Sequence, residues 1–225
     1  MMEKNFNYDA LVKGFESNHV FCHMHPYELY RKWLEAVWAF LNAITDKQGF
    51  RDCLDNYSRA EGEEFGRLLV LYTACVEREP FQDILGQLFM RLDVNSVRAG
   101  QYFTPYSIAE MMARMQFDKE QFTRLVEDKG VVTVCDPAVG SGVMLLAFAG
   151  VVHESLGRWG TDRLRLYGTD IDLRCVHMCK IQIRMNGLDA FGRMAGILGA
   201  MEESVPADAL ILKPGRQLEL PIAAA

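Results

Sequence analysis

The feature that most restricts the fold is a short glycine loop between an apolar run and a long uncharged segment. In VTVCDPAVGSGVMLLAFAGVV (132–152), a β-branched run ends at Asp136 and Pro137, a Gly-Ser-Gly loop follows, and the next ten residues carry no charge. Runs rich in valine and threonine favour buried strands. The stretch therefore predicts a strand, a tight loop and then a helix.

The same alternation continues toward the end of the chain. LRLYGT (164–169) predicts a second strand that ends at Asp170, and residues 173–186 predict a helix closed by Asn186 and Gly187. Weaker signals place strands near 195–198 and at DALIL (208–212). Strands that alternate with helices indicate a parallel sheet. We therefore predict the α/β class, with a shortened Rossmann-like sheet preceded by an all-α domain.

The first part of the sequence predicts helices only. Apolar residues recur at three- and four-residue spacing in three segments, which is the pattern of one buried helical face. We therefore predict a helical domain over residues 1–95 and an α/β domain, with an incomplete C-terminal half, over 96–225. The three sets are Tyr30, Trp33, Leu34, Val37, Trp38, Leu41 and Ile44; Phe65, Leu68, Leu69 and Tyr72; and Phe81, Ile84, Leu85, Leu88, Phe89 and Leu92.

A further helix is expected after VNSVRAGQYFTP (94–105). Thr104 resembles an N-cap, and Pro105 resembles a proline at the first helical position. The apolar face of this helix is expected to comprise Ile108, Met111, Met112 and Met115, packed in the core.

Composition restricts the class of protein. Half of the 225 residues are hydrophobic, so the chain can form a packed core. The start has no apolar signal segment, and the longest apolar run is shorter than the roughly 20 residues that cross a bilayer. The six cysteines form no regular framework, which indicates reduced thiols. We expect a cytoplasmic protein without a membrane partner.

Charge restricts the contact with nucleic acid. The net charge is −6, with residues 1–130 acidic and residues 131–225 near neutral. Strong autonomous binding to DNA normally needs a basic face. Any contact with DNA is therefore expected to be weak, or to depend on a local patch or a partner.

The residues around the glycine loop do not fit a phosphate. A P-loop needs lysine and a hydroxyl residue after the glycines, but Val143 and Met144 follow Gly142. The dinucleotide fingerprint needs another glycine where Leu145 stands. The Asp136 carboxylate at the mouth of the loop would also repel a phosphate.

S-adenosyl-L-methionine fits these residues better, because it carries an ammonium and a sulfonium and no phosphate. Asp136 can pair with the positive charge, and the glycines let the backbone approach the methionine part. Asp170, at the end of the next strand, can accept both ribose hydroxyls, and Ile171 can pack on the adenine face. The alternative is a tight turn that binds nothing.

Three segments together resemble the DNA adenine N6-methyltransferases, in particular the modification subunits of type I restriction systems. They are AGQYFTPYSIAEMM (99–112), DPAVGSGVML (136–145) and YGTDID (167–172), and QDILGQLFM (82–90) is similar to the end of the helical domain that precedes them. The resemblance covers roughly residues 80–200. It implies S-adenosyl-L-methionine as cofactor, held by Phe103, Thr104, Pro105, Asp136, Ala138, Gly140, Gly142, Asp170 and Ile171.

One part of the family pattern is missing. The family carries Asn (or Asp)-Pro-Pro-Tyr (or Phe) after the fourth strand, where it binds the target amine and stacks on the flipped base. This sequence has no such motif, and the positional counterpart is Lys213, Pro214, Gly215 and Arg216. Lysine only donates hydrogen bonds, and a lone Pro-Gly is often a simple turn. The catalytic residues therefore stay unknown.

The resemblance also implies more strands than the sequence supplies. The family fold has about seven strands, and 13 residues follow Leu212. We therefore expect a cofactor-binding half without an evident catalytic half.

Three hypotheses follow. The chain is a methyltransferase subunit that a second methyltransferase or specificity subunit completes, or an inactive relative that binds cofactor or a partner, or it methylates something other than DNA. Outside this site, HVFCHMHP (19–26) gathers histidines and a cysteine at a spacing that matches no standard zinc finger, so we expect no metal site and interpret the histidines as solvated or capping.

Overall fold

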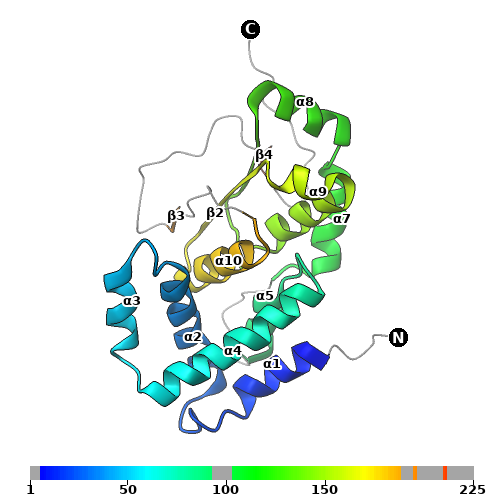
Figure 1. The fold of residues 1–225 in the computed structure, drawn as a ribbon. Helices are drawn as coiled ribbons and strands as arrows, with labels where there is room; N and C mark the ends of the chain where they lie inside the picture. Colours follow the sequence, from blue (N-terminus) through cyan, green and yellow to red (C-terminus); the bar gives the residue numbers. More distant parts are fainter. Residues whose placement is uncertain (1–5, 93–102, 189–194, 197–209, 212–225) are drawn as a thin grey trace. The chain divides into compact units, whose positions relative to one another are not determined.

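The computed structural model describes residues 6–92, 103–188, 195–196 and 210–211, and the chain divides into two compact units (Figure 1). The first unit comprises Met1–Pro80 and Ile84–Tyr102, and the second comprises Phe81–Asp83 and Phe103–Ala225. The three residues Phe81–Asp83 thus belong to the second unit, although helices of the first unit flank them in the sequence.

The described part of the first unit is helical, and its helices begin where the sequence supplies caps. Ser58 and Glu61 form a reciprocal capping box at the start of α4. The His25 ring accepts a hydrogen bond from the Tyr27 N–H at the start of α2, so the prediction of a capping histidine is confirmed at this residue. The helices are α1 (Phe6–Glu16), α2 (Pro26–Leu41), α3 (Lys47–Leu54), α4 (Arg59–Arg78) and α5 (Ile84–Leu92).

Buried aromatic rings form the centre of this unit. The Trp33 ring is fully buried and packs edge-on against Phe15 and Tyr72. Its indole N–H donates to the Phe65 carbonyl at 3.2 Å, and the Tyr30 hydroxyl donates to the Leu85 carbonyl at 2.9 Å. Large rings with a polar group can be buried in this way because the polar group keeps a partner.

The predicted face of α2 is correct except at its end. Ile44 lies beyond the helix and is 90% exposed. The physical reason is Asn42, whose side-chain amide and backbone N–H both donate to the Trp38 carbonyl and end the helix there.

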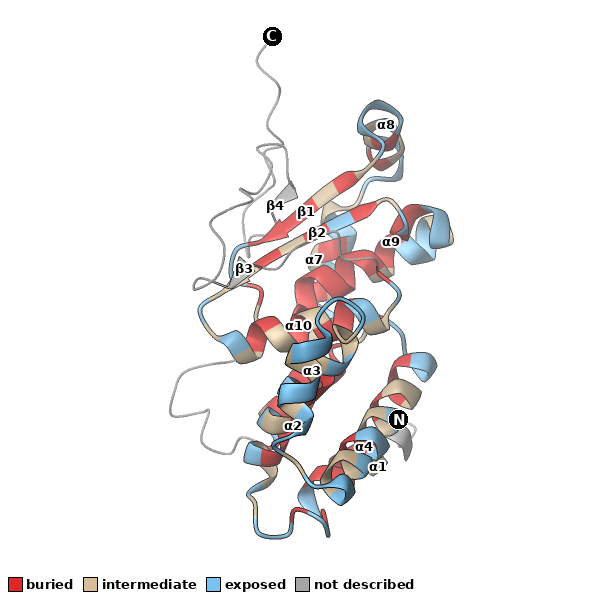
Figure 2. Ribbon diagram, turned by 60° about the vertical axis from the view of Figure 1, so that its left-hand side comes forward, coloured by how far each residue is buried: buried red, intermediate tan, exposed pale blue. Residues whose placement is uncertain are grey.

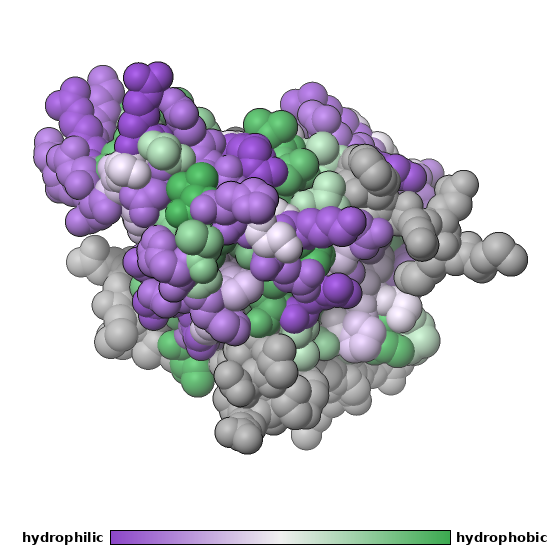
Figure 3. Space-filling view, turned by 90° about the horizontal axis from the view of Figure 1, so that it is seen from below, coloured by the Kyte–Doolittle hydropathy of each residue, from purple (hydrophilic) through white to green (hydrophobic). Residues whose placement is uncertain are grey.

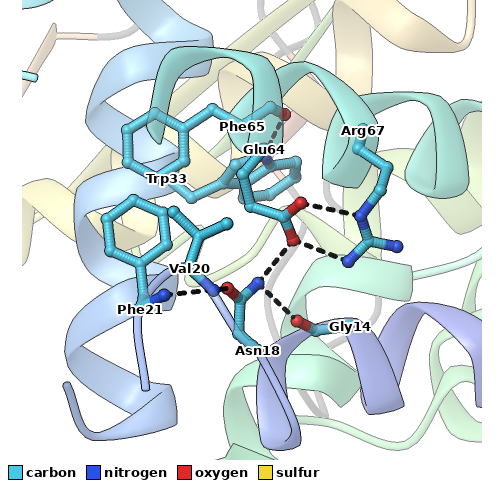
Figure 4. Close-up of polar contacts among 8 residues, drawn as sticks. All are labelled: Gly14, Asn18, Val20, Phe21, Trp33, Glu64, Phe65 and Arg67. Carbon is cyan, nitrogen blue, oxygen red and sulfur yellow. Dashed lines mark hydrogen bonds and ion pairs between the residues drawn. The ribbon is translucent and has the colours of Figure 1, made fainter. Parts of the chain in front are cut away.

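Asn18 ties the end of α1 to α4 (Figure 4). Its side-chain amide donates to the Gly14 carbonyl at 2.9 Å and to the Glu64 carboxylate at 2.6 Å. Its oxygen accepts from the backbone N–H groups of Val20 and Phe21, both at 3.1 Å. The buried Asn18 side chain therefore forms hydrogen bonds with backbone groups before and after the turn that follows α1.

Replacing Asn18 by alanine is expected to lower the free energy of unfolding by about 2 kcal/mol, because it leaves the backbone groups of Gly14, Val20 and Phe21 without this partner and removes one hydrogen bond to the Glu64 carboxylate. Urea denaturation of the full chain measures the loss. Asn56→Ala is the matched control, since Asn56 is exposed and its amide donates only to the nearby Asp52 and Cys53 carbonyls at the end of α3. Equal losses in both variants would contradict the inference that the buried hydrogen bonds of Asn18 stabilise the fold more than those of an exposed asparagine.

The second unit contains a parallel sheet, which confirms the predicted α/β class. Its strand order is β3-β2-β1-β4, and each neighbouring pair is parallel. This is the order of the first four strands of a Rossmann sheet, in which ligands bind outside the carboxyl ends of the strands. The elements are α7 (Tyr106–Gln116), α8 (Lys119–Lys129), β1 (Val132–Asp136), α9 (Val143–Thr161), β2 (Leu164–Asp170), α10 (Leu173–Met185), β3 (Ala195–Gly196) and β4 (Leu210–Ile211).

The core of this unit lies between the strands and α9 (Figure 2). Residues 143–149 of α9 are all buried, which explains why this segment carries no charge. In β1, Val132 and Val134 are buried and pair in register with Leu164 and Leu166 of β2. Since the two strands align without offset, their carboxyl ends reach the same edge of the sheet.

The expectations for α7 are wrong in two respects. Pro105 itself is the N-cap, with φ −56° and ψ 137°, and no side chain caps the helix, so Thr104 does not serve as the cap. Proline fixes φ but leaves ψ free to stay extended, so the helix begins one residue later.

The apolar face of α7 also differs from the prediction. Ala109 and Ala113 are buried, whereas the side chains of Ile108, Met111 and Met115 are exposed. Only Met112 of the predicted set packs partly against the core. The small alanines allow α7 to approach α9 closely, and the larger side chains then point away from the core.

On the face drawn in Figure 3, hydrophilic side chains predominate among the described residues, and apolar side chains appear in small groups among them. Within the part of the chain that the structure describes, no helix combines the length and the apolar character that crossing a membrane requires.

Candidate cofactor site

The site begins where β1 ends. Asp136 is the last residue of this strand, and its side chain is 6% exposed. One carboxylate oxygen accepts a hydrogen bond from the Ala138 backbone N–H at 3.0 Å. The chain thus turns directly after the carboxylate, and the next two residues, Pro137 and Ala138, are exposed.

The glycine loop follows, and its backbone conformation requires glycine at two positions. Gly140 has φ +54°, and Gly142 has φ +97° as the N-cap of α9. A Cβ atom on Gly140 would lie 3.1 Å from the Phe103 ring. A Cβ atom on Gly142 would lie 2.6 Å from the Cys179 sulfur, so a side chain would collide at Gly142 and would press on the Phe103 ring at Gly140.

Residues at the end of β2 accept hydrogen bonds from the glycine loop. The Val139 N–H donates to the Thr169 carbonyl at 2.9 Å, and the Gly140 N–H donates to the Asp170 carboxylate at 2.9 Å. The second Asp170 oxygen accepts from the Asp172 N–H at 2.8 Å. A carboxylate offers about four acceptor positions, so Asp170 retains acceptor capacity for a ligand.

Ile171 lies next to Asp170, and its side chain is 83% exposed. An apolar side chain so exposed beside a carboxylate gives this edge of the site one apolar surface. The sequence motifs assign six of these residues to one site, and the structure brings them to the carboxyl ends of β1 and β2. They are Asp136, Ala138, Gly140, Gly142, Asp170 and Ile171.

Burial sets the electrostatics of the site. The pKa of Asp136 is raised from an ordinary 3.8 to about 6, mainly by burial and to a smaller extent by the nearby Asp170 charge, while the hydrogen bond from the Ala138 N–H opposes the rise. Within the described residues, no lysine, arginine or histidine forms an ion pair with Asp136 or Asp170. A buried carboxylate in such surroundings favours a ligand that brings positive charge.

The three residues Phe103, Thr104 and Pro105 differ in their exposure and in their contact with the glycine loop. Phe103 contacts Gly140, as its distance to a Cβ atom there shows. Phe103 and Thr104 are half-buried, and Pro105 is exposed. The structure thus brings Phe103 to the glycine loop, whereas the roles of Thr104 and Pro105 in binding stay predictions.

Three buried residues that hold the loop, Ser141 within it and Asp83 and Gln182 behind it, were not predicted from the sequence motifs. Ser141 is completely buried, and its hydroxyl donates to the Asp83 carboxylate at 2.7 Å. The Gln182 amide donates to the other Asp83 oxygen at 2.8 Å and to the Ser141 carbonyl at 2.9 Å. The only local signal was a polar residue, Ser141, between two glycines.

The predicted counterpart of the catalytic motif, Lys213, Pro214, Gly215 and Arg216, lies outside the described residues. Of the weak strands, the structure describes 195–196 and 210–211, which lie within the predicted segments.

The arrangement can hold a cationic cofactor with ribose hydroxyls and an apolar ring. The buried Asp136 carboxylate ends β1, the Asp170 carboxylate ends β2, and the exposed Ile171 side chain lies beside Asp170. These residues therefore fit S-adenosylmethionine, whereas the same carboxylates would repel a phosphate.

Known proteins are similar to the region that contains this site. The model of the N-6 DNA methylase family matches residues 77–197, more than half of the chain. A type I restriction enzyme MpnII methylase subunit from Mycoplasma pneumoniae is 31% identical over 90 residues, which are 40% of this chain and 14% of that subunit.

Two solved structures resemble the chain weakly. A Listeria monocytogenes protein assigned to the class I S-adenosylmethionine-dependent methyltransferases is 15% identical with a TM-score of 0.40, and the match covers 85% of this chain and 53% of that one. The methyltransferase subunit of a type I restriction-modification system from Streptococcus thermophilus is 15% identical with a TM-score of 0.39, over 89% and 40% of the two chains. The chain thus spans about half or less of the length of these relatives.

The family model covers the end of α4, α5, α7 and the entire site from Phe103 to Ile171. The resemblance inferred from the sequence motifs is confirmed, and the chain belongs to the N-6 DNA methylase family.

Proposed function

We propose that this chain binds S-adenosylmethionine at the carboxyl ends of β1 and β2 and takes part in methyl transfer to adenine N6 in DNA. The observation that carries the proposal is the buried Asp136 carboxylate at the end of β1, followed along the chain by a loop with two glycines of positive φ. A buried charge of this kind becomes favourable when a cation pairs with it. Membership in the N-6 DNA methylase family supports the same cofactor.

Each part of the cofactor finds a residue of matching chemistry. Asp136 would pair with the ammonium, and the remaining acceptor positions of Asp170 would take the ribose hydroxyls. Ile171 would pack on the adenine, and the backbone of Gly140 would lie against the methionine part. Phe103 would bound that part of the site, and the Thr104 hydroxyl, in the turn before Pro105, would contact the methionine carboxylate.

The bound cofactor would supply an electrophilic methyl group. A target amine needs acceptor groups that bind its hydrogens, and the family places them in a motif that this sequence lacks. Lys213, at the corresponding position, can only donate. We therefore infer that a second methyltransferase or specificity subunit completes the acceptor side.

The same observation favours one alternative function. A chain that binds the cofactor but lacks acceptor groups could act as an inactive relative that regulates a partner. Both functions predict cofactor binding, and they differ in whether a partner restores methyl transfer.

Calorimetry with S-adenosylmethionine tests the binding, with ATP as a ligand of similar base and ribose but with phosphates. Saturable binding of the first and none of the second is expected. Transfer of labelled methyl groups to DNA is then measured for the chain alone and with a modification or specificity subunit added. Label that appears only with the added subunit supports the first function, and binding without any label supports the alternative.

Ile171→Ala is expected to weaken S-adenosylmethionine binding about fivefold, because it removes about 1 kcal/mol of apolar contact with the adenine. The free energy of unfolding should stay within about 0.5 kcal/mol of the wild type, because the side chain is exposed. Leu173→Ala is the control, since Leu173 is also exposed and lies outside the proposed site. An unchanged dissociation constant for Ile171→Ala would remove Ile171 from the site.

A further inference from the structure

In the segment Phe81–Asp83 of the second unit, Phe81 makes three contacts with α9 and with the end of α10. The Phe81 N–H donates to the Asn186 side chain at 2.6 Å, at the end of α10. The Phe81 side chain is buried, its ring lies 5.2 Å from the His153 ring of α9, and its Cβ lies against Gly150. Phe81 has φ +65°, which a non-glycine residue keeps only when its surroundings hold it. This segment is therefore fixed against α9 and α10.

Asp83 is the innermost residue of this segment. Its side chain is 3% exposed, and its two oxygens accept from the Ser141 hydroxyl and from the Gln182 amide. Gln182 also donates to the Ser141 carbonyl. The carboxylate and the amide thus hold Ser141 by its side chain and by its backbone.

Ser141 stands between the two glycines of the cofactor loop, and the loop is consequently fixed from two sides. Asp170 accepts from the Gly140 N–H at the open side, and Asp83 accepts from Ser141 at the buried side. Both glycines have positive φ, and flexible glycines gain order only from such neighbouring contacts. A loop that is already ordered loses less entropy when it binds a ligand.

We propose that Asp83 is a positioning residue that holds the Gly140–Gly142 loop, through Ser141, in the conformation that binds S-adenosylmethionine. The inference rests on the proposed function, because it assigns Asp83 to the same site. Asp83 does not touch the cofactor in this proposal. Its effect on affinity passes through the hydroxyl of Ser141.

A double-mutant cycle on the full chain tests this coupling, with Asp83→Ala, Ser141→Ala and the double variant. S-adenosylmethionine affinity is measured by calorimetry, and thermal denaturation is followed in parallel. Each single variant is expected to raise the dissociation constant about tenfold, since each removes the same charge-assisted hydrogen bond. The double variant should bind about as weakly as the single ones, because the shared bond is lost only once.

Asn186→Ala is the matched control for a purely structural effect. Asn186 holds the same segment through the Phe81 N–H, and its side-chain amide donates to the Gln182 carbonyl of α10 rather than to the glycine loop. It should lower the melting temperature while the dissociation constant stays within about twofold of the wild type. Asp83→Asn keeps the shape of the side chain and should bind with intermediate affinity, which covers the case that Asp83→Ala does not fold.

The outcomes separate the two proposals. A wild-type chain that binds no S-adenosylmethionine overturns the proposed function. A wild-type chain that binds it, with single effects that add in the double variant or with an equal loss of affinity in Asn186→Ala, overturns the positioning role of Asp83 alone.

Discussion

Replacing Gly142 by alanine is expected to abolish S-adenosylmethionine binding and to lower the free energy of unfolding by about 3 kcal/mol. Gly142 has φ +97°, a backbone conformation that L-residues rarely adopt. The new Cβ atom would also lie 2.6 Å from the Cys179 sulfur and 3.3 Å from the Cys179 Cα atom. Because a backbone atom is part of the collision, the loop or α10 has to move, and the loop conformation is lost.

Gly130→Ala is the control that separates strain from collision. Gly130 also has a positive φ, +77°, but a Cβ atom there would meet nothing within 4 Å. It ends α8, far along the chain from the loop. This variant should lose about 1 kcal/mol and keep full affinity. Urea denaturation and calorimetry measure both quantities.

A partial suppressor sharpens the test. Cys179→Ala removes the sulfur, but the Cβ and Cα atoms remain 3.2 and 3.3 Å from the position of the new methyl group. The double variant Gly142→Ala with Cys179→Ala should therefore regain part of the stability and little of the affinity. Full binding by Gly142→Ala itself would show that the loop is not the cofactor site.

The main parts of the site could be predicted because their signals are local. β1, the loop and β2 each occupy a few consecutive residues, and Asp136 and Asp170 stand directly at the strand ends. Parallel strands bring such ends to one edge, so their proximity follows from the strand assignment. The order of the described strands agrees with this expectation.

The contacts of Asp83 could not be predicted, because they join distant parts of the sequence. Asp83 lies 58 residues from Ser141 and 99 residues from Gln182 along the chain. An acidic residue beside a helix start normally indicates an exposed cap rather than a buried carboxylate. Only the packing of Phe81–Asp83 against α9 and α10 removes it from solvent.

The wrong face of α7 has a different cause. Hydrophobicity favours Ile108, Met111 and Met115 as the buried side, whereas close packing on α9 selects the small Ala109 and Ala113. Helices approach one another through small residues when the space between their axes is short. A periodicity that counts only large apolar residues cannot detect this preference.

Asp136→Asn is expected to stabilise the protein without cofactor while it removes most of the affinity for S-adenosylmethionine. The pKa of Asp136 is raised from 3.8 to about 6, mainly by burial. The folded chain therefore binds this proton more tightly than the unfolded chain, so the stabilising contribution is complete below about pH 4 and is lost as the pH rises through about 6. The buried charge then costs about 3 kcal/mol at pH 7.

An asparagine keeps an oxygen for the Ala138 N–H but carries no charge, so it avoids this cost. Asp136→Asn should raise the free energy of unfolding at pH 7.5 by about 1–3 kcal/mol. The difference from the wild type should shrink as the pH falls below about 6 and vanish near pH 4. Asp128→Asn, which changes an exposed carboxylate on α8, should show neither the gain nor its pH dependence.

The affinity for the cofactor should change with pH in the direction opposite to the stability, so that it rises as the pH rises. A cationic ligand needs Asp136 ionised, so wild-type affinity should be steady between about pH 7 and 7.5 and fall as the pH drops through about 6. Asp136→Asn should bind weakly throughout and lack this dependence. Calorimetry between about pH 5 and 7.5 measures the change in affinity, and urea denaturation between about pH 4 and 7.5 measures the change in stability. A variant that is more stable and yet binds as tightly as the wild type would show that the buried charge of Asp136 is not required for cofactor binding. A gain in stability with a loss of affinity would show instead that the charge is retained at a cost to folding because the cofactor requires it.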